Sequence, residues 1–470
     1  MSHTEKKGLN ISVRSFITAI VVIFILMIAA YILSAVIPGG VYARIPDAEG
    51  NLKIDTTEKG GYHPTQGGLP FWKWILSPFL VLGGSGNGTL IAVIAFLLVI
   101  GGVFNSLDHC GLMTYILNKT ANRFSAVRYK LMAIVVLFFM ALGSMIGSFE
   151  ECVPLVPLVC ALAISLGWDS LTGVGMSLLA AGCGFAAGVC NPFTVGVAQQ
   201  LADLPMFSGI WLRLLAFVLI YILLLAFLIF HAKKVERPLE NVQSAISFSR
   251  DTRMDKGMAL FVGILGAGIA IVLSSALIPA LQDLTMIIVA VMFLAAGIIS
   301  TLVSGMSGKE LCKTFWSGIT SIFPAVIMIL MASSIKFTLE EAKVLDTILH
   351  AAVGVAKNLP NWTVILFIYL IVLVMNFFIP SGSAKAFMLI PLIVPLAELF
   401  GISPQLCVVA FAFGDGFSNV FYPTNPALLI SLGLVDVSYG DWFKHSVKFQ
   451  LLNLILTSLL LLLGLFVGYC

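Results

Sequence analysis

Charged side chains are scarce in this sequence: Asp, Glu, Lys and Arg make up 10% of its 470 residues, whereas hydrophobic residues make up 59%. A soluble domain carries about 25% charged residues. The runs 88–104, 208–230 and 451–469 have almost no charge, and they approach the ~20 residues that cross ~30 Å of hydrocarbon. These runs have no polar face, which excludes a soluble protein with a large core. The sequence therefore predicts an all-α polytopic membrane protein in a lipid bilayer.

The sequence also lacks the patterns of several functional classes. Its net charge of +3 is spread over loops, which predicts no nucleic-acid partner. There is no Walker A pattern, so ATP-driven pumping is unsupported. The eight cysteines have no metal-ligand spacing, and the six histidines do not combine with cysteines or carboxylates as a metal or catalytic set would. We therefore expect no enzymatic activity, no metal site and no cofactor, with Na⁺ or H⁺ as the possible coupling ion.

An internal duplication organises the chain. Residues 147–192 align without a gap on 381–426, 234 positions later, and Asn191-Pro192 then coincides with Asn425-Pro426. Matched prolines, glycines and Asn-Pro pairs carry weight because each fixes backbone geometry. Paired, proline-interrupted apolar segments in two halves of a membrane protein indicate the binding site of a secondary transporter.

Lysine and arginine mark cytoplasmic segments. Lys6, Lys7 and Arg14 place the N-terminus inside, and the basic linker 232–256 should lie inside as well. The run 13–37 is too long for a signal-peptide core and is predicted to be a retained first helix. We predict nine crossings with the C-terminus outside. Seven of them are unbroken: 13–37, 88–108, 208–231, 258–280, 284–304, 315–335 and 447–469.

Two further segments are predicted to be re-entrant hairpins. Hairpin 129–167 has its tip at 147–151, hairpin 361–402 has its tip at 380–385, and both tips are small and polar. Irregular backbone is tolerated at membrane depth only where protein or water covers it. In the alternative interpretation, the two arms of 129–167 are full crossings joined by an outer loop.

The last two crossings are predicted to be broken helices, 171–203 and 404–433. Each repeat then holds three crossings, an odd number, so the repeats are inverted. Amphipathic arms at 109–128 on the inner surface and 337–358 on the outer surface complete the prediction, with a polar outer loop at 38–86.

The two Asn-Pro pairs should open these helices, because proline cannot donate an intrahelical hydrogen bond and clashes with the preceding turn. Opened backbone offers carbonyls to a cation and a half-helix N-terminus to an anion, and asparagine both donates and accepts. We expect substrate contacts from Asn191, Pro192, Thr194, Thr424 and Asn425. In the alternative, each pair is a plain proline kink.

The two hairpin tips carry opposite charge. Glu150 and Glu151 lie at the first tip, and Lys385 at the second aligns with Glu151. A carboxylate near the bilayer centre costs roughly 2.5–3.5 kcal/mol, so the glutamates need cationic partners or water. A substrate with a cationic side chain and an α-carboxylate would match both tips. The alternatives are a Glu151–Lys385 ion pair that only fastens the tips, and solvated glutamates in an outer loop.

Other polar residues at the same depth are further candidates for substrate binding: Ser148, Ser381, Gly382, Ser383, Asp415 and Asn419. Of these, Asp415 could coordinate Na⁺, bind a proton or pair with Lys385.

These motifs resemble a known family. The likeness is carried by Glu150-Glu151-Cys-Val-Pro-Leu-Val-Pro, Gly167-Trp-Asp-Ser-Leu-Thr-Gly-Val, Gly184-Phe-Ala-Ala-Gly-Val-Cys-Asn-Pro-Phe-Thr-Val-Gly-Val-Ala-Gln and Pro380-Ser-Gly-Ser-Ala-Lys. They look like bacterial basic amino-acid (arginine/ornithine) antiporters, which are related to the C4-dicarboxylate anaerobic carriers of the ion transporter superfamily. The likeness runs from about residue 15 to 465.

The resemblance implies a homodimer in the bacterial inner membrane, with a scaffold domain and a mobile transport domain that moves as an elevator. Sodium clamps in that superfamily often show Ser-Asn-Thr at the hairpin tips. This sequence has Gly-Ser-Phe-Glu-Glu and Ser-Gly-Ser there, which weakens the case for sodium coupling.

The hypothesis is a secondary transporter that moves a small amino-acid-like solute by alternating access. Segments 129–206 and 361–434 would form the transport domain, and 1–128, 207–360 and 435–470 the scaffold. Glu150 and Glu151 favour exchange of cationic amino acids such as arginine and ornithine. Lys385 and the helix ends favour a Na⁺- or H⁺-coupled carrier of dicarboxylates or other small carboxylates. A channel or a membrane scaffold would leave the paired breaks without a purpose.

Overall fold

The structure of the protein is a computed structural model. It describes residues 13–46, 52–54, 61–84, 87–116, 119, 127–147, 149–237, 251–275, 285–356 and 359–470. One predicted site residue, Ser148, lies outside the described residues, as do part of the predicted inner arm 109–128 and part of the basic linker 232–256.

Long helices occupy the segments predicted to cross the membrane without a break. They are α1 Val13–Val36, α4 Asn87–His109, α11 Ile210–Val235, α13 Thr252–Ser275, α15 Thr285–Val303, α16 Gly308–Glu341 and α22 Tyr439–Phe466. Within the described part of the chain, five helices are long and apolar enough to span a bilayer: Arg128–Ile146, Ser170–Leu201, Ile210–Val235, Gly308–Glu341 and Tyr439–Phe466. The protein is thus mostly helical with several apolar spans, and the count of nine crossings stays a prediction.

The predicted hairpins and broken helices appear as two similar sets of elements. The first set is α6 Arg128–Ile146, η3 Glu150–Leu155, α7 Val156–Ser165, α8 Ser170–Val174, η4 Gly175–Leu179, α9 Ala180–Ala187, η5 Pro192–Gly196 and α10 Val197–Leu201. The second set is α18 Asn361–Phe378, α19 Gly382–Glu398, α20 Pro404–Asn419 and α21 Pro426–Leu434. In both sets a helical hairpin precedes a helix that is interrupted before an Asn-Pro pair.

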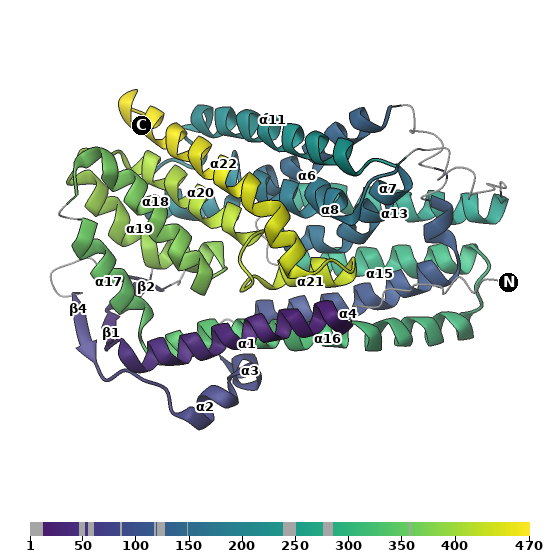
Figure 1. Cartoon of the computed structure of the whole chain (residues 1–470), viewed down its shortest axis with the longest axis horizontal. Coiled ribbons are helices and arrows are strands. Elements are labelled where there is room, and N and C mark those ends of the chain that lie inside the picture. The colour runs from purple at the N-terminus through teal and green to yellow at the C-terminus, as the bar shows by residue number, and fades with distance from the viewer. Residues whose placement is uncertain are drawn as a thin grey trace.

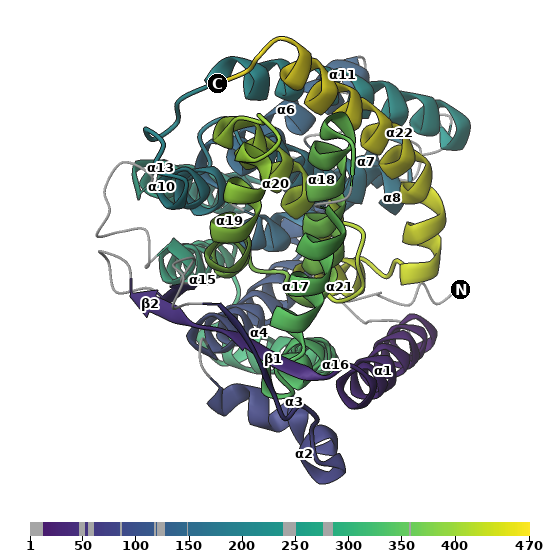
Figure 2. The ribbon, with the colours of Figure 1, turned by 90° about the vertical axis from the view of Figure 1, so that its left-hand side faces the viewer.

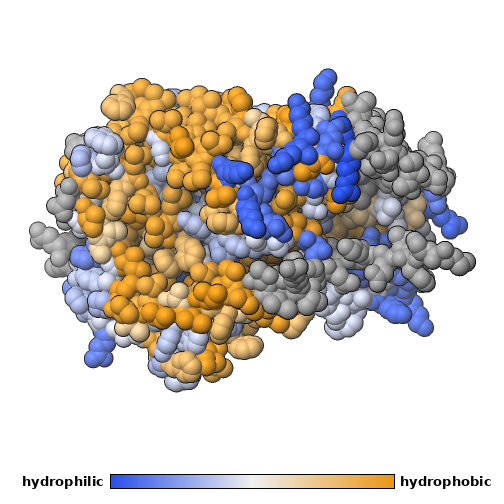
Figure 3. All heavy atoms as spheres, viewed as in Figure 1, coloured by the Kyte–Doolittle hydropathy of each residue, from blue (hydrophilic) through white to orange (hydrophobic). Residues whose placement is uncertain are grey.

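The two sets are flanked by long helices. In Figure 1, α11 runs along the top, α22 slants from the upper left into the middle, α1, α4 and α16 lie along the bottom, and α18, α20 and α8 lie between. Figure 2 shows the same order from the left-hand end, with α18, α19 and α20 in the middle. Apolar side chains cover a broad band of the face in Figure 3, and hydrophilic ones gather toward its right-hand end. This distribution suits a protein whose long helices cross a bilayer.

The prediction of an all-α chain is wrong in the loop 38–86. Four short strands form there, β1 Gly39–Tyr42, β2 Arg44–Pro46, β3 Leu52–Ile54 and β4 Tyr62–Thr65. Strand β1 pairs antiparallel with β4, and β2 pairs antiparallel with β3. A cross-strand aromatic pair, Tyr42 and Tyr62, supports the first ladder with ring centroids 5.6 Å apart. The polar composition of the loop concealed these strands.

These strands contact a short helix, α17 Leu345–Ala356. Arg44 forms a 2.9 Å ion pair with Asp346, and the Tyr42 N–H donates to the same carboxylate at 2.9 Å. The Tyr62 hydroxyl lies 2.8 Å from the Thr347 hydroxyl. Both views place β1 beside α17. The loop is therefore fastened to the outer arm of the prediction.

The boundaries predicted for α16 and for the outer arm are wrong. The predicted crossing ends at residue 335 and the predicted arm begins at 337, but α16 continues to Glu341. Lys336 and Glu340 lie four residues apart on this helix and form a 3.3 Å ion pair, which supports helical structure. The charged residues therefore extend the crossing helix, and the arm is reduced to α17.

Helices α6, α9 and α20 touch through their backbones. A Cβ atom added to Gly184 of α9 would lie 1.9 Å from the carbonyl oxygen of Met140 in α6. A Cβ added to Gly416 of α20 would lie 2.3 Å from the Cα of Ala186 in α9. These glycines are needed because only the absence of a side chain permits such close approach.

Replacing Gly184 with alanine is expected to destabilise the protein by about 1–3 kcal/mol, the usual cost of overpacking. The colliding atom belongs to the backbone of α6, so no side chain can move aside. The matched control is Gly266→Ala in α13, where a new Cβ meets nothing within 4 Å. There the helix should be unchanged or slightly more stable. Unfolding of the two purified variants would be compared, and equal stability would contradict the close packing of α6 on α9.

Candidate functional site

Each Asn-Pro pair begins a new half-helix. The Asn191 Oδ1 accepts hydrogen bonds from the N–H groups of Phe193 at 3.0 Å and Thr194 at 3.3 Å. The Asn425 Oδ1 does the same for Ala427 at 2.9 Å and Leu428 at 3.4 Å. The proline that follows occupies the first helical position, where its missing N–H removes nothing. The pairs are therefore complete breaks and not kinks in continuous helices.

The capping role changes what the asparagines can offer a ligand. Both Oδ1 atoms are occupied by backbone N–H groups, so the two side chains have lost their acceptors and could offer a ligand only their Nδ2 donors. The Asn191 Nδ2 remains, buried and without a partner among the described residues. The Asn425 Nδ2 donates to the Asn419 Oδ1 at 3.1 Å.

The first break, residues 188–191, rests on the first hairpin. The Ser144 Oγ accepts from the Val189 N–H at 3.0 Å, and the Ser144 carbonyl accepts from the Cys190 N–H at 3.0 Å. A Cβ added to Gly147 at the hairpin tip would lie 2.4 Å from the Asn191 Oδ1. The tip and the break are thus in direct contact. Sequence reasoning missed Ser144, because a serine in an apolar helix gives no signal of its partner.

The second hairpin tip lies between the two broken helices. A Cβ added to Gly382 would be 2.6 Å from the Cγ2 of Thr194 and 2.6 Å from the Oδ2 of Asp415. At Gly182 of α9, an added Cβ would meet Val420 of the second break at 2.4 Å and Phe149 of the first tip at 3.5 Å. The structure therefore gathers both tips and both breaks into one region, as the duplication predicted.

Lys385 forms an ion pair with Asp415 inside this region. Its Nζ lies 2.6 Å from the Asp415 Oδ1, and both side chains are 0% exposed. The same Nζ donates to the Ile379 carbonyl at 3.2 Å and to the Asn376 Oδ1. Of the pairings considered, Asp415 is the partner of Lys385 and Glu151 is not.

Another asparagine, Asn376, is absent from the prediction and connects the members of this network. The Asn376 Nδ2 lies 3.0 Å from the Asp415 carbonyl, 2.6 Å from the Ser418 Oγ and 2.9 Å from the Asn419 Oδ1. Asn376 is part of α18 and the other three belong to α20. It therefore ties the second hairpin to the second broken helix. Its residue type was visible in the sequence, but its place opposite α20 was not.

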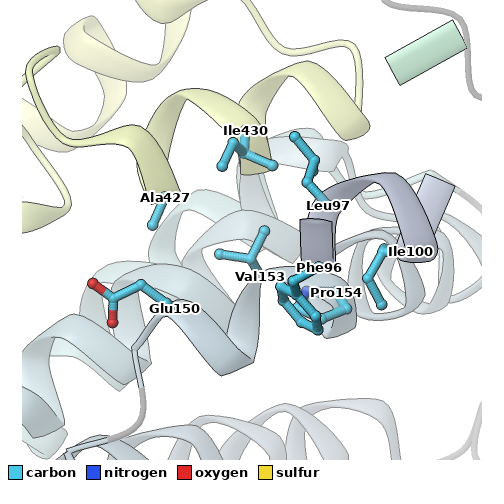
Figure 4. A pocket seen from close by; sticks show the side chains of 8 residues that line it. All are labelled: Phe96, Leu97, Ile100, Glu150, Val153, Pro154, Ala427 and Ile430. Atoms are coloured by element: carbon cyan, nitrogen blue, oxygen red, sulfur yellow. The ribbon is translucent and has the colours of Figure 1, made fainter. Parts of the chain in front are cut away.

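The two glutamates of the first tip have no ion-pair partner among the described residues. The Glu151 Oε2 is buried and accepts no hydrogen bond there. Glu150 borders a hollow of about 10 Å³, about the room for one water molecule. Apolar side chains of α4, η3 and α21 form the rest of its wall, and in Figure 4 the carboxylate points away from them. Within the described residues, therefore, no cationic side chain neutralises either carboxylate.

Several other polar atoms in this region are buried without partners among the described residues. They are Thr194 Oγ1, Thr424 Oγ1 and Asp415 Oδ2, together with the Asn191 Nδ2 and Glu151 Oε2 already described. Buried polar groups are nearly always hydrogen-bonded, so this concentration indicates a place for a polar ligand or water. Ser381 is exposed and Ser383 half-buried, and no hydrogen bond of their side chains to either break is found in the described part. Nor do its His, Cys, Asp and Glu residues form a group of three or more that could hold a metal ion.

Comparison with known proteins gives a family match over nearly the whole chain. Residues 16–466 match the family model described as "C4-dicarboxylate anaerobic carrier". An Escherichia coli (strain K12) protein named "Putative basic amino acid antiporter YfcC" is 30% identical over 415 residues, which cover 82% of this chain and 80% of that protein. A Haemophilus influenzae relative of undescribed function is 25% identical over 399 residues, covering 80% and 76%.

Among solved structures, two distant likenesses cover almost all of the chain. The YdaH transporter of Alcanivorax borkumensis has 16% sequence identity and a TM-score of 0.43, covering 97% of this chain and 99% of that one. MtrF of Neisseria gonorrhoeae, described among antimetabolite efflux pumps, has 18% identity and a TM-score of 0.45, covering 95% and 94%.

Proposed function

The chain belongs to the C4-dicarboxylate anaerobic carrier family of transporters, and on this premise we propose that it exchanges cationic amino acids of the arginine and ornithine type across the membrane. It is a transporter and not an enzyme. The proposal concerns the substrate, the residues that bind it and the way in which it moves.

One observation carries the choice of a cationic substrate. Lys385 and Asp415 neutralise each other at 2.6 Å, which leaves Glu150 and Glu151 as the uncompensated charges of the tip region within the described residues. Two carboxylates in a poorly hydrated site attract a cation and repel an anion. A dicarboxylate would bring two more negative charges to the same place, with Lys385 no longer free to receive them.

The geometry suggests how an amino acid would lie. Its guanidinium or ammonium side chain would face Glu150 and Glu151. Its α-carboxylate would face the N-terminal ends of the half-helices that start at Pro192 and Pro426, where the helix dipole favours negative charge. The unpartnered atoms Asn191 Nδ2 and Thr194 Oγ1 are the nearby candidates for hydrogen bonds. The sequence directs this carboxylate toward Lys385 and a helix end; because Lys385 is paired with Asp415, we propose the helix ends alone.

The relative from Escherichia coli, named as a basic amino acid antiporter, supports this substrate class. The description of the family supports a second candidate, a carrier of C4-dicarboxylates, for which Na⁺ or H⁺ would be the coupling ion. In that case Lys385 would have to leave Asp415 whenever substrate binds.

Transport by purified protein in proteoliposomes separates the two candidates. Vesicles loaded with arginine or ornithine are expected to take up labelled arginine by counterflow without any ion gradient. The control is the same vesicles loaded with succinate, which should give no counterflow. Uptake of succinate that requires Na⁺, with no arginine exchange, would remove the cationic proposal in favour of the dicarboxylate carrier.

We also propose the architecture in which exchange occurs. Segments 129–206 and 361–434 would form a transport domain that moves as an elevator against a scaffold of 1–128, 207–360 and 435–470. The hairpins would be re-entrant within inverted repeats, and the N-terminus would face the cytoplasm at the bacterial inner membrane. The protein would act as a homodimer. The support is the gathering of both tips and both breaks in one region, with long apolar helices on either side.

A further inference from the structure

We propose that Lys385 is a tethered cation: its ammonium group fills an oxygen-lined cage that would otherwise take a monovalent metal ion such as Na⁺, so that transport needs no coupling sodium. The inference concerns the ion and not the solute, and its test below uses no substrate.

The partners of the ammonium are the kinds of ligand that a hard metal cation prefers. They are a carboxylate oxygen of Asp415 at 2.6 Å, the carbonyl oxygen of Ile379 at 3.2 Å and the amide oxygen of Asn376. Hard cations are bound in proteins by carboxylate, carbonyl and amide oxygens. Lys385 and Asp415 are 0% exposed, so the cage is closed to bulk solvent.

The cage also lies where coupling ions lie in secondary transporters. Ile379 follows the last residue of α18 as its C-cap, and the C-terminal end of a helix carries partial negative charge. Coupling cations in such proteins are held by opened backbone carbonyls and half-helix C-terminal ends. The ammonium of Lys385 occupies this type of position without being a diffusible ion.

The cage is held together by groups other than Lys385. Asn376 is fixed to α20 through the Asp415 carbonyl and the Ser418 hydroxyl, at 3.0 and 2.6 Å. The second carboxylate oxygen of Asp415 is buried and has no partner among the described residues. A small ion in place of the ammonium could therefore use the existing ligands and this spare oxygen as well.

The duplication shows that the cation and its ligands occur together. In the 234-residue register, Asp415 corresponds to Ala181 and Lys385 to Glu151. The first repeat thus has neither this carboxylate ligand nor the cation. If Lys385 only made its hairpin tip polar, the second repeat would not need a carboxylate at Asp415 to receive it.

The experiment removes the ammonium and supplies sodium. Melting temperatures of purified full-length protein would be compared in NaCl and choline chloride at equal ionic strength. The wild-type value should be the same in both salts. In Lys385→Ala, Na⁺ should raise the melting temperature over that in choline by about 2–4 °C or more, because an ion that binds the folded state stabilises it.

Three further variants separate this inference from an ordinary ion pair. Lys385→Met fills the volume with an apolar chain and should show no response to Na⁺. Lys385→Ala combined with Asp415→Asn should lose the response, because the carboxylate ligand is gone. Lys336→Ala, which breaks the partly exposed 3.3 Å pair with Glu340, should also show none.

The outcomes decide the proposal either way. A sodium response confined to Lys385→Ala supports it. Stabilisation of the wild type by Na⁺ overturns it, as do equal melting temperatures of Lys385→Ala in the two salts. Lys385→Ser provides a second test with a less apolar replacement, and failure of both variants to fold in NaCl counts against the proposal, since Na⁺ should take the vacated cage.

Discussion

Exchange of arginine is expected to fall by about thirtyfold or more when Glu151 is replaced by glutamine, because losing one partner of a buried charge pair costs 2–5 kcal/mol and each 1.4 kcal/mol is a factor of ten. The two side chains are almost the same size, so the packing of the first tip should be kept. What is removed is a carboxylate whose Oε2 is buried and without a partner among the described residues. A cationic substrate would supply that partner.

The matched control is Glu341→Gln at the end of α16. Its side chain is 39% exposed and pairs with Lys73, so exchange should be unchanged. Counterflow in proteoliposomes gives the rates, and melting temperatures show whether each variant is folded. Full exchange activity in folded Glu151→Gln would show that Glu151 is outside the substrate site.

Asp415→Asn is expected to have the largest effect on stability. It would leave the Lys385 ammonium buried without its counter-charge, and removing one partner of a buried ion pair costs about 3–5 kcal/mol. Glu340→Gln breaks the partly exposed pair with Lys336, and such pairs contribute only about 0–1 kcal/mol. Unfolding in mixed micelles titrated with SDS would give both free energies.

The double variant Lys385→Met with Asp415→Leu is the complementary test. Replacing both members of a buried pair with apolar residues of similar volume is often neutral for stability. We expect it to recover most of what Asp415→Asn loses. The Asn376 Oδ1 would lose its hydrogen bond from Lys385, whereas the backbone carbonyl of residue 415 would still accept from the Asn376 Nδ2. If Asp415→Asn is as stable as the wild type, the pair is not a buried charge pair.

The sequence predicted those features that single residues impose on the backbone. Asparagine caps a helix and proline suits its first position, so the two Asn-Pro pairs marked the places where the new half-helices begin. Glycine and serine at the tips similarly marked the turns of the hairpins. The long apolar runs gave the crossing helices, apart from their ends. The strands at 39–65 were missed because each is only three or four residues long and lies in polar sequence.

Contacts between distant segments could not be predicted from local patterns. The register of the duplication set Lys385 opposite Glu151, but it relates equivalent positions and not neighbours in space. Lys385 pairs instead with Asp415, thirty residues later, because α19 packs against α20. Asn376 and Ser144 were overlooked for the same reason: each contacts the helix that follows its own hairpin.

The glycine contacts among α6, α9 and α20 bear on how access to a solute could change. Helices that meet backbone to backbone have no side chains between them to rearrange, and interfaces of this kind resist sliding. We therefore expect the binding region to move as one stiff body that includes both hairpin tips. Any displacement of this body would then occur at its outer boundary. The hollow between α4, η3 and α21 lies on that boundary. This packing supports the proposed travel of the whole body past its neighbours, with no hinge inside it.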